Sequence, residues 1–157
     1  MNEPKDLPSI DLIDRGVAEH PAAAVLVLPR FDGQYSGYAT DILGLLDEAH
    51  VACDYLSDPM LTGVHEEKAA DAFLPLLFFV STAVATASDW ITVTDGAIHV
   101  ARYFLERVGP KGTVRFRGAY EVVKHGRRET AIVSLDLPGG SDPAAAIREA
   151  LRPLRHD

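Results

Sequence analysis

The side chains best suited to chemistry in this sequence belong to three aspartates and one serine. Asp32 and Ser36 lie in a loop over residues 30–37, and Asp54 and Asp58 lie at the end of a later apolar segment. Paired carboxylates can bind Mg²⁺ or share a proton. If the four side chains converge, they predict the catalytic site of a small enzyme that acts on a nucleotide or a sugar phosphate.

The loop over residues 30–37 is also a place where a small-molecule ligand would bind. It follows an apolar strand, and ligands of open α/β sheets gather at the carboxyl ends of strands. Gly33, Gln34 and Gly37 are therefore the ligand-binding candidates. The loop contains neither the G-x-G-x-x-G nor the G-x-x-x-x-G-K-[ST] pattern, so the sequence predicts no phosphate cradle.

Each of these candidates also has a purely structural explanation. Ser36 suits the cap of the helix that follows, and Asp58, which precedes a proline, suits the start of a turn. Residues 65–67 begin like a zinc protease motif, but Ala69 stands where the second histidine belongs. A solvated helix face explains these residues better.

We expect no metal ion and no cofactor. Asp95 and His99 are four residues apart on one predicted helix face, which suits a structural hydrogen-bonded pair, since two ligands do not make a metal site. Cys53 is the only cysteine, which excludes an internal disulfide and argues against a cysteine-based zinc site.

A cluster of basic residues is predicted on the outer face and turn of a late hairpin. Its members are Arg115, Arg117, Lys124, Arg127 and Arg128. Tyr120 has the opposite strand parity, so no aromatic platform lies beside them and nucleic acid is disfavoured as a partner. A charged edge that protects the hairpin from aggregation explains the same residues.

The charge of the chain is unevenly distributed. The net charge is −8, but residues 1–71 hold 4 basic and 14 acidic residues, whereas residues 102–135 hold 8 basic and 3 acidic residues. The acidic total disfavours non-specific attraction to phosphate backbones. The two segments are expected to attract each other within the fold, with contact across a homo-oligomer or to an anionic partner as the alternatives.

Length and composition indicate one globular domain over residues 1–157. The hydrophobic fraction of 47% and the charged fraction of 24% are ordinary for a soluble domain. Residues 1–8 are expected to be flexible, and they lack the features of a secretory signal, so a cytoplasmic location is expected. The uncharged stretch 72–88 is rich in small and hydroxylic residues in its second half, so no membrane span is predicted.

The first part of the chain predicts a β-α-β unit. Residues 22–29 form a short apolar run between prolines, which indicates a strand buried on both faces. Residues 38–50 show helical periodicity, and residues 51–56 return to strand character. The two strands should be parallel. A short helical turn over residues 10–17, capped by Ser9, could pack on the sheet.

The middle of the chain is the most apolar part. Residues 64–72 are expected to be helical. Residues 75–80 fit either a buried strand or the start of a helix, and the alanines that follow favour the helix. Beyond residue 89, apolar residues recur at spacings of three and four, which predicts a long helix ending near Val108.

The last part of the chain predicts a hairpin and a helix. Alternating apolar and charged residues indicate an antiparallel hairpin over 113–137 with its turn at His125 and Gly126, and a C-terminal helix is expected over 143–153. The fold class is therefore α/β, with α+β as the alternative. We expect a single-domain sandwich in which a mixed sheet joins the parallel unit to the hairpin and long apolar helices within 72–108 cover it.

Two functions are compatible with these features. The absence of catalytic motifs, the divided charge and the apolar helix surface favour a non-catalytic module that binds another protein or self-associates. The alternative is the small enzyme with its site at the ends of the first two strands. The sequence resembles no family that would decide between them.

Overall fold

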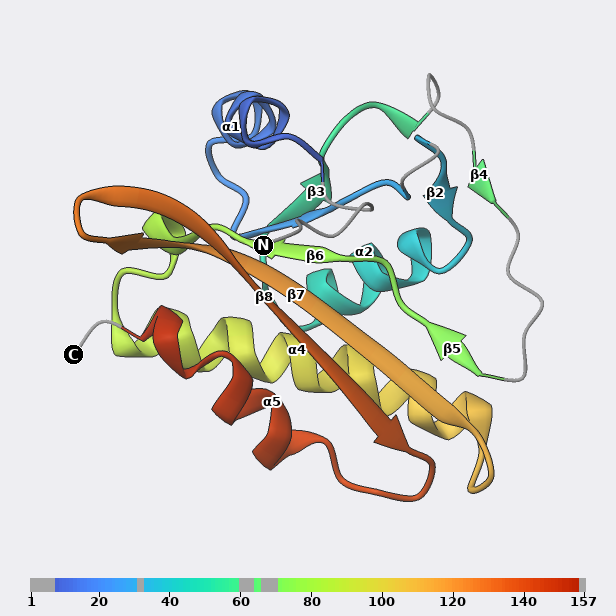
Figure 1. Ribbon diagram of the computed structural model, residues 1–157. Coiled ribbons are helices and arrows are strands. Elements are labelled where there is room, and N and C mark those ends of the chain that lie inside the picture. Colours follow the sequence, from blue (N-terminus) through green and yellow to red (C-terminus); the bar gives the residue numbers. More distant parts are fainter. Residues whose placement is uncertain (1–7, 31–32, 60–63, 66–70, 156–157) are drawn as a thin grey trace.

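The computed structural model describes residues 8–30, 33–59, 64–65 and 71–155, and its centre is a mixed β-sheet (Figure 1). The strands of this sheet are β1 (Val25–Val27), β3 (Cys53–Tyr55), β5 (Ala72–Phe73), β6 (Leu77–Phe79), β7 (Thr113–Lys124) and β8 (Arg127–Pro138). Their order is β3-β1-β6-β7-β5, and β8 pairs with β7. Since β5 and β6 share one edge of β7, β8 occupies the other edge along its full length. The mixed α/β class is confirmed.

The predicted β-α-β unit is confirmed. Strand β1 pairs in parallel with β3, and Val25 lies opposite Cys53. The connection between them contains α2 (Ala39–Glu48), whose buried residues face the sheet. Both strands are shorter than the apolar runs that predicted them, because hydrogen-bonded pairing covers only the central part of each run.

The helix expected over residues 64–72 is wrong where the structure describes it. Strand β4 (Val64–His65) pairs in parallel with β2 (Tyr35–Ser36) in a separate small sheet, and β5 already begins at Ala72. Residues 66–70 lie outside the described part of the chain, as do residues 1–7 of the segment expected to be flexible.

The preference for a helix over residues 75–80 is also wrong, because β6 is a strand. It lies between β1, to which it is antiparallel, and β7, to which it is parallel. Leu77 and Phe79 pack on one face of the sheet and Phe78 packs on the other. A run that is apolar at every position suits a central strand with two covered faces, which the alanine content of the following residues does not reveal.

The long helix is confirmed as α4 (Ala87–Val108), the longest helix among the described residues. It begins with a capping box, in which the Thr86 hydroxyl accepts from the Asp89 N–H at 3.0 Å and the Asp89 carboxylate accepts from the Thr86 N–H at 3.1 Å. It ends at Gly109, whose φ of 76° suits a glycine. Only this second half of the 72–108 stretch is helical beyond one 3₁₀ turn, η1 (Ser81–Ala83).

Helices cover both faces of the sheet, so the architecture has three layers (Figure 1). Helices α2, α4 and α5 (Ala144–Ala150) pack on one face, in a core that includes Phe79, Phe104 and Phe116. Helix α1 (Ile10–Glu19), which begins at the predicted cap Ser9, packs on the other face through Ile13. The expected packing of this segment on the sheet is confirmed.

The hairpin predicted over 113–137 is confirmed, and it extends one residue further, to Pro138. Strands β7 and β8 pair without a bulge from Thr113 opposite Pro138 to Lys124 opposite Arg127. The turn residues His125 and Gly126 have φ of 52° and 75°, as a type I′ turn requires. The C-terminal helix ends earlier than predicted, at Ala150, and continues as the 3₁₀ turn η2 (Arg152–Leu154).

None of the helices in the described residues combines the length and the apolar character that a membrane crossing needs.

A matched pair of phenylalanine substitutions tests this account of the core. Phe79 is fully buried in β6, whereas Phe73 in β5 is 48% exposed. Phe79→Ala should lower the free energy of unfolding by about 3–5 kcal/mol, because it leaves a cavity. Phe73→Ala, the control, should cost less than about 1 kcal/mol, mainly from its contact with the Arg115 guanidinium. Urea denaturation followed by circular dichroism measures both; equal losses would contradict the assigned layers.

Candidate functional site

Two tyrosine rings fill the region where the sequence predicts a ligand site. Tyr35 is fully buried, and its ring meets that of Tyr55, at the end of β3, edge to face at 4.8 Å. The Tyr35 hydroxyl donates to the Ser57 carbonyl and accepts from the Ser57 N–H, both at 2.9 Å. The Tyr55 hydroxyl lies 3.0 Å from the Thr40 hydroxyl. These aromatic groups join the loops after β1 and β3 to the start of α2.

Burial raises the pKa of the Tyr35 hydroxyl above its ordinary value, and the hydrogen bonds to Ser57 oppose this rise. The hydroxyl is therefore a neutral structural group at physiological pH. It is positioned to tie two loops together.

The loop residues proposed from the sequence take up local roles. The Ser36 hydroxyl accepts from the Tyr38 N–H at 3.2 Å, just before α2. Gly33 has a left-handed φ of 83° within a turn that the Arg30 N–H closes by donating to the Gln34 carbonyl. Gln34 is exposed and Gly37 is partly buried beside this turn. Asp32 lies outside the described residues.

The two predicted carboxylates in and after β3, Asp54 and Asp58, are directed to different surroundings. Asp54 accepts from the Tyr55 N–H at 2.8 Å and lies 3.0 Å from the His20 ring nitrogen, at the end of α1. Asp58 is exposed in the loop that follows β3. Asp54 thus connects the edge of the sheet to α1.

A groove of about 500 Å³ lies at the opposite, amino-terminal ends of β1 and β3. Its lining includes His20, Asp47, Cys53 and Asp54. Burial, together with the nearby charges of Asp47 and Asp54, raises the pKa of the Cys53 thiol from 9.0 to about 11. The thiol is therefore protonated at neutral pH, which does not suit a nucleophile.

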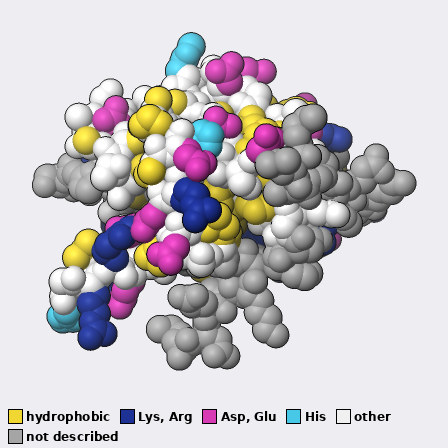
Figure 2. All heavy atoms as spheres, turned by 90° about the horizontal axis from the view of Figure 1, so that it is seen from above, with side chains coloured by type: hydrophobic (Ala, Val, Ile, Leu, Met, Phe, Trp, Pro, Cys, Tyr) yellow, Lys and Arg dark blue, Asp and Glu magenta, His cyan; other side chains and the backbone are white. Residues whose placement is uncertain are grey.

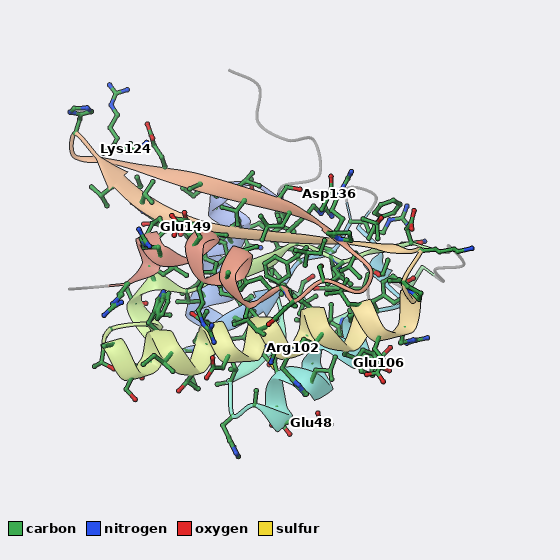
Figure 3. The ribbon with its side chains drawn as sticks, turned by 90° about the horizontal axis from the view of Figure 1, so that it is seen from below. Glu48, Arg102, Glu106, Lys124, Asp136 and Glu149 are labelled. Carbon is green, nitrogen blue, oxygen red and sulfur yellow. The ribbon has the colours of Figure 1, made fainter. Side chains whose placement is uncertain are left out.

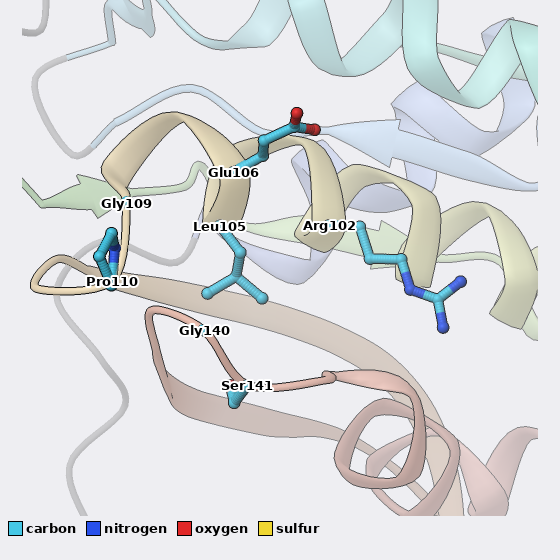
Figure 4. A pocket seen from close by; sticks show the side chains of 7 residues that line it. All are labelled: Arg102, Leu105, Glu106, Gly109, Pro110, Gly140 and Ser141. Atoms are coloured by element: carbon cyan, nitrogen blue, oxygen red, sulfur yellow. The ribbon is translucent and has the colours of Figure 1, made fainter.

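A second hollow, of about 360 Å³, separates the end of α4 from the loop after β8 (Figure 4). Leu105 points toward this loop, whereas Glu106 points away from it (Figure 4). The Arg102 guanidinium already donates to the Asp142 carboxylate at 3.1 Å. The hollow therefore offers one apolar wall and no free converging polar groups for a ligand.

The remaining candidates for metal binding have separate partners. His99 lies 2.9 Å from Glu48 on α2, and Asp95 lies 3.7 Å from Arg148 on α5. The expected pairing of Asp95 with His99 is therefore replaced by contacts that join α4 to its neighbouring helices. Across the part of the chain that the structure describes, no three His, Cys, Asp or Glu side chains gather closely enough to hold a metal ion.

The basic residues of the hairpin do not share one face. Arg115, Arg117 and Arg128 lie on the face of the sheet that carries α1, whereas Lys124 and Arg127 follow the opposite parity at the turn. Basic and acidic side chains are interspersed on the α1 side of the molecule (Figure 2).

Two of these arginines are held by carboxylates. Arg115 donates to Asp136 at 2.8 Å, and Arg128 donates to both Glu121 and Asp14 at 2.7 Å. These carboxylates raise the pKa of the Arg128 guanidinium above its already high value. The Arg128–Asp14 pair also shows the expected attraction between the basic segment and the acidic first part of the chain.

The outer edge of β8 is a long strand edge with outward-facing backbone groups. Two observations show which residues of β8 bond to β7. The Gly139 N–H donates to the Gly112 carbonyl just beyond one end of the ladder, and at the other end the two-residue turn makes Lys124 and Arg127 a hydrogen-bonded pair. Because pairing alternates along an antiparallel ladder, odd-numbered residues of β8 bond to β7. The even-numbered residues direct their N–H and C=O groups outward; they are Arg128, Thr130, Ile132, Ser134 and Asp136.

Among the described residues, no strand pairs with this outer edge of β8. It is the longest such edge, because β3 at the other side of the sheet has only three residues. The sequence does not reveal this edge, since periodicity identifies strands but does not show which strand lies at the margin of a sheet.

Comparisons with known proteins do not add a relationship. No family model matches the chain, and neither the curated proteins nor the solved structures yield a significant match.

The raised pKa of Cys53 makes a measurable prediction. At pH 8, a pKa of about 11 instead of 9.0 leaves roughly a hundred-fold less thiolate. Iodoacetamide should therefore alkylate the native protein at least tenfold more slowly than the protein unfolded in urea. The native rate should rise with pH through the range 9 to 11. A native rate equal to the unfolded rate at pH 8 would contradict the burial of this thiol.

Proposed function

We propose that this protein is a non-catalytic protein-binding module whose binding element is the outer edge of β8. The observation that carries the proposal is the row of outward N–H and C=O groups along a strand of twelve residues. Extended segments of other proteins pair with such edges by adding a strand to the sheet. Main-chain hydrogen bonds then supply affinity, and alternate side chains supply specificity.

The composition of β8 supports the proposal. Soluble proteins usually protect a sheet edge with short strands, prolines, bulges or inward-pointing charges. Residues 130–135 of β8 contain no charge, proline or glycine, and the pairing with β7 has no bulge. The charges of β8 are confined to its ends, at residues 127–129 next to the turn and at Asp136 next to the loop. Lys124 at the turn and Asp136 lie at opposite ends of the hairpin (Figure 3). The middle of the edge is therefore open to pairing.

The surroundings of the candidate catalytic side chains also favour a binding function over catalysis. Tyr35 and Tyr55 fill the end of the parallel pair where an α/β enzyme would bind its substrate. The Cys53 thiol has a raised pKa, and Asp54 is engaged by His20. We also propose a cytoplasmic location, which the single unpaired cysteine suits.

A proline in the outer edge tests the proposal without disturbing the fold. Ser134 is exposed, and its N–H points away from β7. Ser134→Pro removes this donor but keeps the β7–β8 ladder, and proline is tolerated at strand edges. Linear peptides selected from a displayed library for binding to the wild type should bind the variant about tenfold or more weakly, measured by fluorescence polarisation.

Ser134→Ala is the matched control, because it removes the hydroxyl and retains the N–H. It should bind the selected peptides like the wild type. Both variants should keep the near-ultraviolet circular dichroism spectrum and melt within a few degrees of the wild type. If every selected peptide binds Ser134→Pro and the wild type equally, the edge is not the binding element.

A further inference from the structure

We infer that the strand which occupies the β8 edge is β8 of a second copy of this chain, antiparallel and centred on Ile132. The inference rests on the proposed function and names its partner. The result would be one continuous sheet across two molecules, related by a two-fold axis perpendicular to the sheet.

The direction of the backbone groups restricts the possible registers. In an antiparallel pair, residues that lie opposite each other have side chains on the same face of the sheet. With Ile132 opposite Ile132, every outward-facing residue of one copy meets an outward-facing residue of the other. Thr130 then lies opposite Ser134, and Arg128 lies opposite Asp136. All the outward N–H and C=O groups between Arg128 and Asp136 can be paired.

Charge selects this register among its neighbours. One end of the α1-side face carries Arg128 with Asp14 and Glu121, a formal net charge of −1. The other end carries Asp136 with Arg115, and Arg117 lies two residues along the same strand face, which gives a net charge of +1. We call the set around Arg128 the negative end and the set around Asp136 the positive end.

An antiparallel partner brings the negative end of each copy beside the positive end of the other. The edge is therefore self-complementary in charge as well as in hydrogen bonding. Moving the centre to residue 131 would place Arg128 opposite Ser134, and moving it to residue 133 would place Arg128 opposite Pro138. Either change separates Arg128 from Asp136 and loses the charge match.

The apolar surface at the centre also suits a second copy. Ile132 is partly buried and packs at the margin of the core beneath α1. Its side chain would contact Ile132 of the second copy. The partly exposed apolar surface at the edge of each core would then be buried against the same surface of the other copy. Thr130 and Ser134, opposite each other on both sides of this contact, add a hydroxyl pair.

The first test is the mass of the full chain in solution as a function of concentration. Light scattering after size exclusion, and sedimentation equilibrium up to about 1 mM, should show a dimer for the wild type and for Ser134→Ala. Ser134→Pro should be monomeric at the same concentrations. Raising the salt from about 50 to 500 mM should weaken the wild-type dimer, because the paired ends are exposed.

The second test determines the register by disulfide formation. Paired residues of this kind have Cα atoms about 5.5 Å apart, within the range that a disulfide spans. Ile132→Cys should give a covalent dimer under mild oxidation, and so should the double variant Thr130→Cys with Ser134→Cys. Ser134→Cys alone is the matched control, and it should link much less because it faces Thr130. The native Cys53 should leave the wild type unlinked.

The outcomes separate this inference from the function on which it rests. A wild type that stays monomeric to about 1 mM while peptides bind in a Ser134-dependent manner overturns the second copy as partner and retains the binding edge. A dimer that persists in Ser134→Pro, or that links at Ser134→Cys in preference to Ile132→Cys, overturns the proposed interface or its register. Failure of peptide binding together with a monomeric wild type overturns both.

Discussion

The fold depends on the burial of β6 on both faces and along both edges. Leu77 and Phe79 need α4 and its neighbours on one side, and Phe78 needs α1 on the other. The two edges need β1 and β7, so the parallel unit and the hairpin must meet on this strand. One short apolar segment therefore requires the parallel unit, the hairpin and helices on both faces, and the three layers follow from it.

Much of this architecture can be predicted from the sequence, because the periodicity of apolar side chains shows which face of each helix or strand is buried. The parallel pair, α4 and the hairpin are predicted from such patterns, whereas the cap at Ser9 is predicted from the residue type. Periodicity is uninformative where every position is apolar, so the choice between strand and helix at residues 75–80 depends on the alanines that follow, and these favour a helix, which is wrong. Periodicity is equally uninformative for two-residue strands such as β5, whose structure comes from a distant partner, β7.

The candidate sites were harder to predict than the elements, because chemistry depends on direction and neighbours. The loop after β1 was correctly placed at the carboxyl end of a strand, but sequence alone did not show that Tyr35 turns inward and bonds to Ser57. Asp54 was recognised as a carboxylate at a strand end, whereas its contact with His20 depends on where α1 packs. The free edge of β8 depends on strand order, a property of the whole sheet.

The contiguity of β7 and β8 has a consequence for how the chain folds. Their ladder joins residues close in sequence, so it can form in microseconds, whereas β6 reaches β7 only by closing a loop of about forty residues. Until β6 pairs, both outer edges of the newly formed hairpin, on β7 and on β8, are unpaired. A strand of a neighbouring molecule can then pair with β7 before the chain's own β6 does. Domain swapping between newly synthesised molecules is therefore the characteristic misfolding hazard of this topology.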